Sequence, residues 1–212
     1  MTPFEQDLQE LTDQTVRMLS LVREAVELAR RSLVGADPEA AVRGQRVEDE
    51  INDLQDQLES RILSVIARRQ PAARDLRLLG ATYRSLADIE RAGDYAFHVS
   101  RAGAEMASEP PLKKYLDMDR ILAIEIAMID ETARALAESD TEAARRGHAM
   151  DEEVDQLYEQ IQRELITYMI EDPRTITKAT RLLGVARHLE RLGDHLENVD
   201  EHILFWLTGR RG

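Results

Sequence analysis

The sequence contains no cysteine among its 212 residues, which excludes disulfide bonds, thiolate metal sites and cysteine nucleophiles. Aromatic residues make up only 4% of the chain, and there are 10 glycines and 6 prolines. Because helix breakers are scarce and Ala, Leu, Glu and Arg dominate, the composition favours helices over strands. These shortages predict an all-α fold.

Long hydrophobic runs are also missing. None approaches the roughly 18 apolar residues that a membrane span needs, and the most apolar stretch, 121–129, is interrupted by Glu125. The acidic N-terminus lacks the apolar segment of a signal peptide. We therefore expect a soluble, cytoplasmic protein with no membrane insertion.

Basic residues are outnumbered by acidic ones in this chain. It has 28 Lys and Arg against 41 Asp and Glu, which gives a net charge of −13. Nucleic-acid-binding proteins need a basic surface to displace counterions from phosphates. The charge therefore argues against a nucleic-acid partner. It is compatible with metal cations or with a basic protein partner.

The few breakers fall at the ends of segments with helical periodicity. The turn at 35–39 offers Asp37 as an N-cap followed by proline, and the turn at 138–144 offers Asp140 or Thr141. Apolar residues spaced by three and four between these turns predict helices. The six expected helices span about 4–34, 38–69, 72–107, 117–138, 141–170 and 174–208.

The six expected helices fall into two similar sets of three, separated by a Pro-Pro segment. INDLQDQL at 51–58 parallels VDQLYEQI at 154–161, and IERAGD at 89–94 parallels LERLGD at 189–194. Such self-similarity indicates an internal duplication with a period near one hundred residues. We expect two tandem antiparallel three-helix bundles. Their expected bounds are 1–109 and 116–212.

A Glu-Arg-x-Gly-Asp motif occurs once in each half, at 90–94 and 190–194. Each helical residue advances about 100°, so Glu190 and Asp194 share one narrow face. Their repulsion costs a few tenths of a kcal/mol, and the glycine before each Asp costs about 1 kcal/mol relative to alanine. A solvated acidic face, copied by the duplication, is one explanation. A cation site that justifies the repeated cost is the other.

A second polar pair with i,i+4 spacing lies on the helix before each motif. The pairs are Glu48 with Asn52, and Asp151 with Asp155. Antiparallel packing would bring each pair opposite the Glu-x-x-x-Asp of its own half. Four oxygen donors from two helices suit Mg, Mn, Fe or Ca. The Glu-x-x-His spacing of di-iron bundles is missing.

Three histidines, His188, His195 and His202, are spaced by seven along one stripe. That spacing separates neighbours by about 10 Å along the helix axis, which is too far for one metal ion. We expect them to form hydrogen bonds between helices or at an interface. The chain has no glycine-rich phosphate loop, nucleophile elbow or His-Glu-x-x-His motif, so we expect no catalytic residues.

These motifs, in this order and twice over, resemble the PhoU family of bacterial phosphate-signalling regulators. The resemblance covers nearly the whole chain. In the first half it rests on VEDEINDLQ (47–55), RRQPAARDLRLL (68–79) and LADIERAGDYA (86–96). In the second half it rests on MDEEVDQLY (150–158) and EDPRTITKATRLLGVARHLERLGDHLENVDEHILFWLTG (171–209).

The resemblance implies E/D-x-x-x-D motifs that bind Fe, Mn, Mg or Zn ions, sometimes as multinuclear clusters. The implied ligands of the first half are Glu48, Asn52, Glu90 and Asp94. Those of the second half are Asp151, Asp155, Glu190, Asp194 and Asn198. His98 stands where Asn198 stands, so we expect the first site to be weaker or to hold a different ion. We expect the acids to point away from each core.

The resemblance also implies a function without enzymatic activity. It describes a cytoplasmic adaptor, as a homodimer, that negatively controls phosphate uptake and phosphate-starvation signalling. The implied partners are the ATPase subunit of a Pst-type phosphate transporter and a sensor histidine kinase. The alternatives are a metal-dependent carboxylate-bundle hydrolase or oxidase, and a helical scaffold without metal. Regulation of another transporter also stays open.

Overall fold

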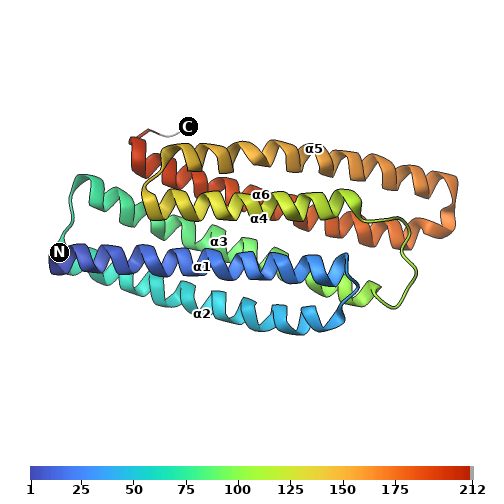
Figure 1. Cartoon of the computed structure of the whole chain (residues 1–212), viewed down its shortest axis with the longest axis horizontal. Helices are drawn as coiled ribbons and strands as arrows, with labels where there is room; N and C mark the ends of the chain where they lie inside the picture. Colours follow the sequence, from blue (N-terminus) through green and yellow to red (C-terminus); the bar gives the residue numbers. More distant parts are fainter. Residues whose placement is uncertain (211–212) are drawn as a thin grey trace.

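The computed structural model describes residues 1–210, which form six long helices and no strand (Figure 1). The helices are α1 Pro3–Leu33, α2 Pro38–Arg69, α3 Ala73–Met106, α4 Leu116–Glu138, α5 Thr141–Glu171 and α6 Ile176–Thr208. The all-α prediction is confirmed, and every expected boundary lies within two residues of the observed one. The largest difference is at the start of α6, where Pro173–Thr175 forms a separate 3-10 turn, η1.

Capping side chains explain where the helices begin. The Asp37 carboxylate accepts a hydrogen bond from the Glu39 N–H at 3.1 Å, which confirms it as the N-cap of α2. Asp140 accepts from the N–H groups of Glu142 and Ala143, so Asp140 caps α5 and Thr141 is its first residue. Each cap pairs N–H groups that the helix itself leaves free.

The two halves are three-helix bundles that lie side by side. Helices α1, α2 and α3 pack on one another, as do α4, α5 and α6. Between the halves, α3 packs along α6 and α1 packs along α4, which leaves α2 and α5 at the outer edges (Figure 1). The expected duplication is therefore present. Of the expected second bundle, residues 211–212 lie outside the described part.

Buried apolar side chains from both halves form one continuous core. The connection between the bundles, residues 107–115, runs at the end of the molecule opposite the N-terminus (Figure 1). Because the core continues from one bundle into the other, the halves form one packed unit.

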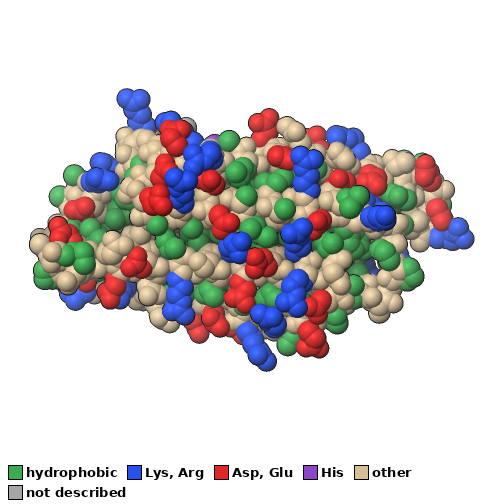
Figure 2. Space-filling model, in the orientation of Figure 1, with side chains coloured by type: hydrophobic (Ala, Val, Ile, Leu, Met, Phe, Trp, Pro, Cys, Tyr) green, Lys and Arg blue, Asp and Glu red, His purple; other side chains and the backbone are tan. Residues whose placement is uncertain are grey.

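Acidic and basic side chains alternate on the face shown in Figure 2. Ion pairs cross between the halves on α1 and α4: the Arg23 guanidinium lies 2.9 Å from Asp130, and a second pair joins Arg30 to Asp119. The net charge of −13 is therefore not gathered into one acidic patch on this face. Within residues 1–210, no helix has the length and hydrophobicity to cross a membrane.

Candidate metal centre

Three carboxylates of the second half meet between α5 and α6. Asp151 and Asp155 lie one turn apart on α5, and Asp194 faces them from α6. One oxygen from each comes within 4.8 Å of the others. Oxygen ligands at this separation suit a single hard cation. The structure thus brings together three of the five residues expected for the second half, and we call them the acidic cluster.

Asp151 is the buried member of the acidic cluster. Its exposed fraction is 4%, and its Oδ1 has no hydrogen-bond partner. Gly193 makes room for it, since a Cβ added to Gly193 would come 2.4 Å from Asp151 Oδ1. The expectation that the acids point away from the core is therefore wrong for Asp151. The packing of α6 against α5 covers a carboxylate that lies beside the apolar residues of its own helix.

Burial and mutual repulsion both disfavour ionisation in the acidic cluster. Burial raises the pKa of Asp151 to about 7, and the charges of Glu197, Asp155, Asp194 and Glu190 add to this rise. Burial, followed by the charge of Asp194, raises the pKa of Asp155 and of Glu190. A cation would remove this repulsion and favour the ionised forms.

The two remaining ligands expected in the second half lie differently. Glu190 borders the acidic cluster, and its Oε2 is buried without a hydrogen-bond partner. Asn198 instead donates a hydrogen bond to Asp88 of α3 at 3.4 Å. Its amide nitrogen therefore points toward the contact between α3 and α6.

Sequence reasoning left out Glu197 as a site residue. After burial, its charge is the largest contribution to the raised pKa of Asp151. Its carboxylate also lies 3.2 Å from the imidazole Nδ1 of His148. Glu197 shares the helix face of Glu190 and Asp194, so its spacing in the sequence could have identified it as a site residue.

The expected first-half ligands lie on facing helices but form a sparser site. Burial raises the pKa of Glu90, and the charges of Asp94 and Glu48 add to this against that of Arg91. Asn52 donates to Glu48 at 2.7 Å. Among the described residues of this half, no three Asp, Glu or His ligand atoms come within 4.8 Å of one another. An amide at position 52 replaces the carboxylate that Asp155 supplies in the second half.

The histidines line the contact between α3 and α6, which we call the α3–α6 seam. Asp88 accepts hydrogen bonds from His195 at 2.9 Å and from His202 at 3.2 Å. Burial opposes ionisation of Asp88, but these bonds outweigh it and lower its pKa to about 2. The His188 ring lies 5.7 Å from that of Tyr95. The expected hydrogen bonds between helices are confirmed for His195 and His202, whereas His188 makes ring contacts instead; Asp88 was missed.

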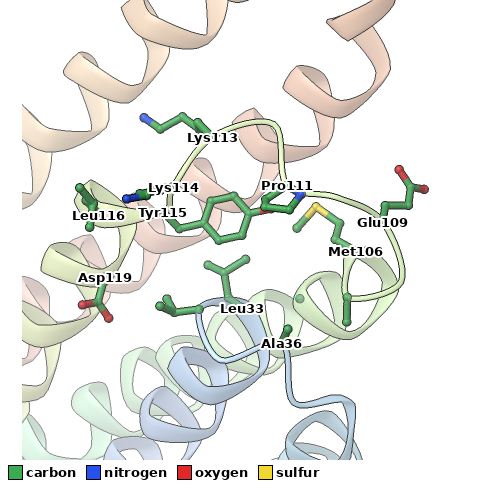
Figure 3. A pocket seen from close by; sticks show the side chains of 13 residues that line it. Leu33, Ala36, Met106, Glu109, Pro111, Lys113, Lys114, Tyr115, Leu116 and Asp119 are labelled. Atoms are coloured by element: carbon green, nitrogen blue, oxygen red, sulfur yellow. The ribbon is translucent and has the colours of Figure 1, made fainter.

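A pocket of about 400 Å³ opens near the connection between the halves (Figure 3). The side chains of Leu33, Met106 and Tyr115 surround it. The acids at its rim are in ion pairs, Asp119 with Arg30 and Glu109 with Lys178 and Arg181. None of the acidic cluster lines this pocket. The pocket and the acidic cluster are therefore separate features of the molecule.

Comparison with known proteins supports the resemblance over the full length of the chain. The family model of the PhoU domain matches twice, at residues 15–102 and 118–203. A phosphate-specific transport system accessory protein PhoU homolog of Deinococcus radiodurans is 44% identical over 208 residues, covering 98% of each chain. The phosphate-specific transport system accessory protein PhoU of Escherichia coli is 31% identical, covering 98% of this chain and 86% of its own.

Solved structures agree with the fold. The crystal structure of PhoU from Pseudomonas aeruginosa superposes with a TM-score of 0.93 at 33% identity, covering 98% of this chain and all of that one. PhoU from Streptococcus pneumoniae superposes with a TM-score of 0.90 at 24% identity, which supports the fold alone. Since the two domain matches coincide with the two bundles and the identity extends over nearly the whole chain, the chain belongs to the PhoU family.

Proposed function

We propose that this chain is an accessory regulator of a phosphate transport system. In this role it acts on the cytoplasmic side of the importer and links its ATPase subunit to a sensor histidine kinase. The observation that carries the proposal is the 44% identity, over 98% of both chains, to a protein named as a phosphate-specific transport accessory protein. A linking role needs binding surfaces and no reaction, in keeping with the paired acids around the pocket of Figure 3.

Deleting the gene is expected to raise phosphate uptake and starvation-gene expression in cells grown with ample phosphate. A tagged copy of the chain should restore repression and should co-purify with the ATPase subunit and the kinase after cross-linking. A tagged unrelated helical protein controls for non-specific capture. Unchanged uptake in the deletion strain, together with capture of neither partner, would contradict the proposed role.

We further propose that the acidic cluster binds a hard cation from the group Fe, Mn and Mg, with Zn less suited to an all-oxygen site. Three carboxylate oxygens within 4.8 Å of one another support this. So does the buried, unpaired oxygen of Asp151, because an unpaired buried carboxylate is costly without a compensating charge. The first half is expected to release its ion at a lower chelator concentration, since Asn52 supplies no charge there.

Changing Glu190→Gln together with Asp194→Asn should lower the bound metal of the second half and leave helicity intact. In metal-free protein the same change should raise the melting temperature, because it removes like charges that repel by a few tenths of a kcal/mol or more. Elemental analysis after dialysis against one Mn²⁺ buffer measures the first effect, and thermal melts measure the second.

A control for this change neutralises two exposed acids of α2, Glu50→Gln with Asp53→Asn. It should leave the Mn²⁺ content unchanged. Equal Mn²⁺ content in the unaltered protein and in the Glu190/Asp194 variant would contradict metal binding by the motif and would identify it as a solvated acidic face.

A further inference from the structure

Glu125 is a buried acid that the helix pattern does not explain. It lies in the middle of the apolar stripe of α4, its exposed fraction is 0%, and neither of its oxygens has a hydrogen-bond partner. An ionised carboxylate in this setting costs several kcal/mol, and even the neutral acid loses its hydrogen bonds to water. Burying the Glu125 carboxyl group therefore costs free energy that no hydrogen bond in the structure offsets.

The internal duplication shows which position of the first half corresponds to Glu125. The capping residues Asp37 and Asp140 are 103 positions apart, and the two domain matches begin with the same offset, at residues 15 and 118. The same offset relates Glu125 to Val22. The first half therefore carries an apolar residue, itself fully buried, where the second half carries an acid.

The surroundings of Val22 indicate what Glu125 faces. Val22 lies 3.7 Å from the position of a Cβ added to Gly93 of α3. The counterpart of Gly93 is Gly193 of α6, against which Asp151 Oδ1 packs. The pKa of Glu125 is well above its usual range, mainly through burial and then through the charge of Asp151. The correspondence through the duplication therefore places Glu125 on the side of Gly193 against which Asp151 packs, and the charge of Asp151 acts on it.

Glu125 and Asp151 therefore both carry buried oxygens without a hydrogen-bond partner, two on Glu125 and one on Asp151. We propose that Glu125 is an inner ligand of the second-half metal centre, holding a hard divalent cation together with Asp151. This inference rests on the proposed metal binding of the acidic cluster. Because Asp151 has two oxygens, it can bind a cation on the Glu125 side and still belong to the cluster. The ion would supply the charge compensation that Glu125 lacks.

The first half lacks this inner position. Ile51 occupies the space beside Gly93, with its Cδ1 2.7 Å from the position of an added Cβ, and Val22 packs beside it. Apolar side chains thus fill the space that carboxylates fill in the second half. If Glu125 is a ligand, the first half should bind a cation more weakly because it has Val22 at the corresponding position. This difference adds to the missing charge at Asn52.

The test uses Mn²⁺ as the probe and calorimetric titration of the metal-free full chain. Glu90→Gln with Asp94→Asn removes the first-half site from this background. In it, Glu125→Gln is expected to weaken Mn²⁺ binding about tenfold or more, as loss of even an outer partner of a metal ligand does. The rise in melting temperature on adding Mn²⁺ should shrink with it. If the glutamine variant does not fold, Glu125→Val, which restores the residue of the first half, should show the same loss.

Asp200→Asn is the matched control. Asp200 is also fully buried, and it packs against Gly147 in the same bundle. Its replacement should leave Mn²⁺ affinity unchanged. Unchanged affinity in the Glu125 variants, with binding lost in the Glu190/Asp194 variant, would overturn the inner ligand and leave the acidic cluster as the site. No Mn²⁺ binding by the background protein itself would overturn both.

Discussion

Replacing Gly103 with alanine is expected to lower the free energy of unfolding by about 3 kcal/mol, at the upper end of the usual range for overpacking. A Cβ at this position of α3 would come 2.6 Å from the backbone nitrogen of Leu33 and 2.7 Å from the carbonyl carbon of Ser32. A side chain in the way could rotate aside, whereas the backbone of α1 cannot. The Ser32 hydroxyl also donates to the Ser100 carbonyl at 2.6 Å, which holds the helices together here. The two helices would have to separate and lose packing.

Two other helical glycines provide the control. A Cβ added to Gly80 of α3 or Gly184 of α6 would meet nothing within 4 Å. Alanine at these positions should stabilise the protein by up to about 1 kcal/mol, because glycine is the poorer helix former. Urea unfolding followed by circular dichroism measures all three variants. A Gly103→Ala protein as stable as the unaltered one would contradict the close approach of α1 and α3.

The metal-free protein is expected to lose stability as the pH rises from about 4 to about 7, by about 4 kcal/mol from Asp151 alone. Its pKa is about 7 in the folded protein, against 3.8 for the free group, mainly through burial and then through neighbouring acids. Between these values the folded protein binds a proton that the unfolded chain has released. The free energy of unfolding therefore falls as the pH rises through this window, and the full cost is present above the folded pKa.

Asp151→Asn should flatten this pH dependence, because asparagine does not ionise. The exposed Asp53→Asn is the matched control and should keep the slope of the unaltered protein. Urea unfolding across the window, with a chelator present, gives the free energies. Saturating Mn²⁺ should restore stability at the upper end, since a bound cation favours the ionised carboxylate. Parallel pH profiles for the unaltered and Asp151→Asn proteins would contradict the raised pKa.

Local signals predicted the helices well because their causes are local. Asp37 and Asp140 end turns through bonds to N–H groups two or three residues away, which a sequence displays directly. The start of α6 was predicted two residues too early, because Pro173–Thr175 forms a 3-10 turn that continues almost directly into α6. The pairing of Asp151 and Asp155 with Asp194 also followed from spacing and antiparallel packing.

Burial of particular acids could not be predicted in the same way. A step of about 100° per residue places Asp151 on a helix face, but the approach of α6 at Gly193 decides whether that face is covered. The partner of His195 and His202 was hidden because Asp88 is more than one hundred residues away. Glu125 was visible in the sequence as an interruption of an apolar stretch, but its complete burial became known only from the packing of the helices.

The α3–α6 seam joins unlike side chains of the two halves. The two copies of the motif are one hundred residues apart, so the counterparts of Asp88, His195 and His202 are His188, Tyr95 and Ala102. Equivalent positions of the two halves therefore face each other across the seam but carry different side chains. Asp88 accepts hydrogen bonds from two imidazoles, whereas its counterpart His188 packs against the ring of Tyr95.

Two first halves placed together would set Asp88 against a phenol and a methyl group, and two second halves would crowd imidazoles against one another. Both arrangements leave polar groups without their partners, which makes pairing of like halves unfavourable. The chemistry of the seam therefore favours contact between unlike halves, so an exchange of halves between two polypeptides is expected to join a first half to a second.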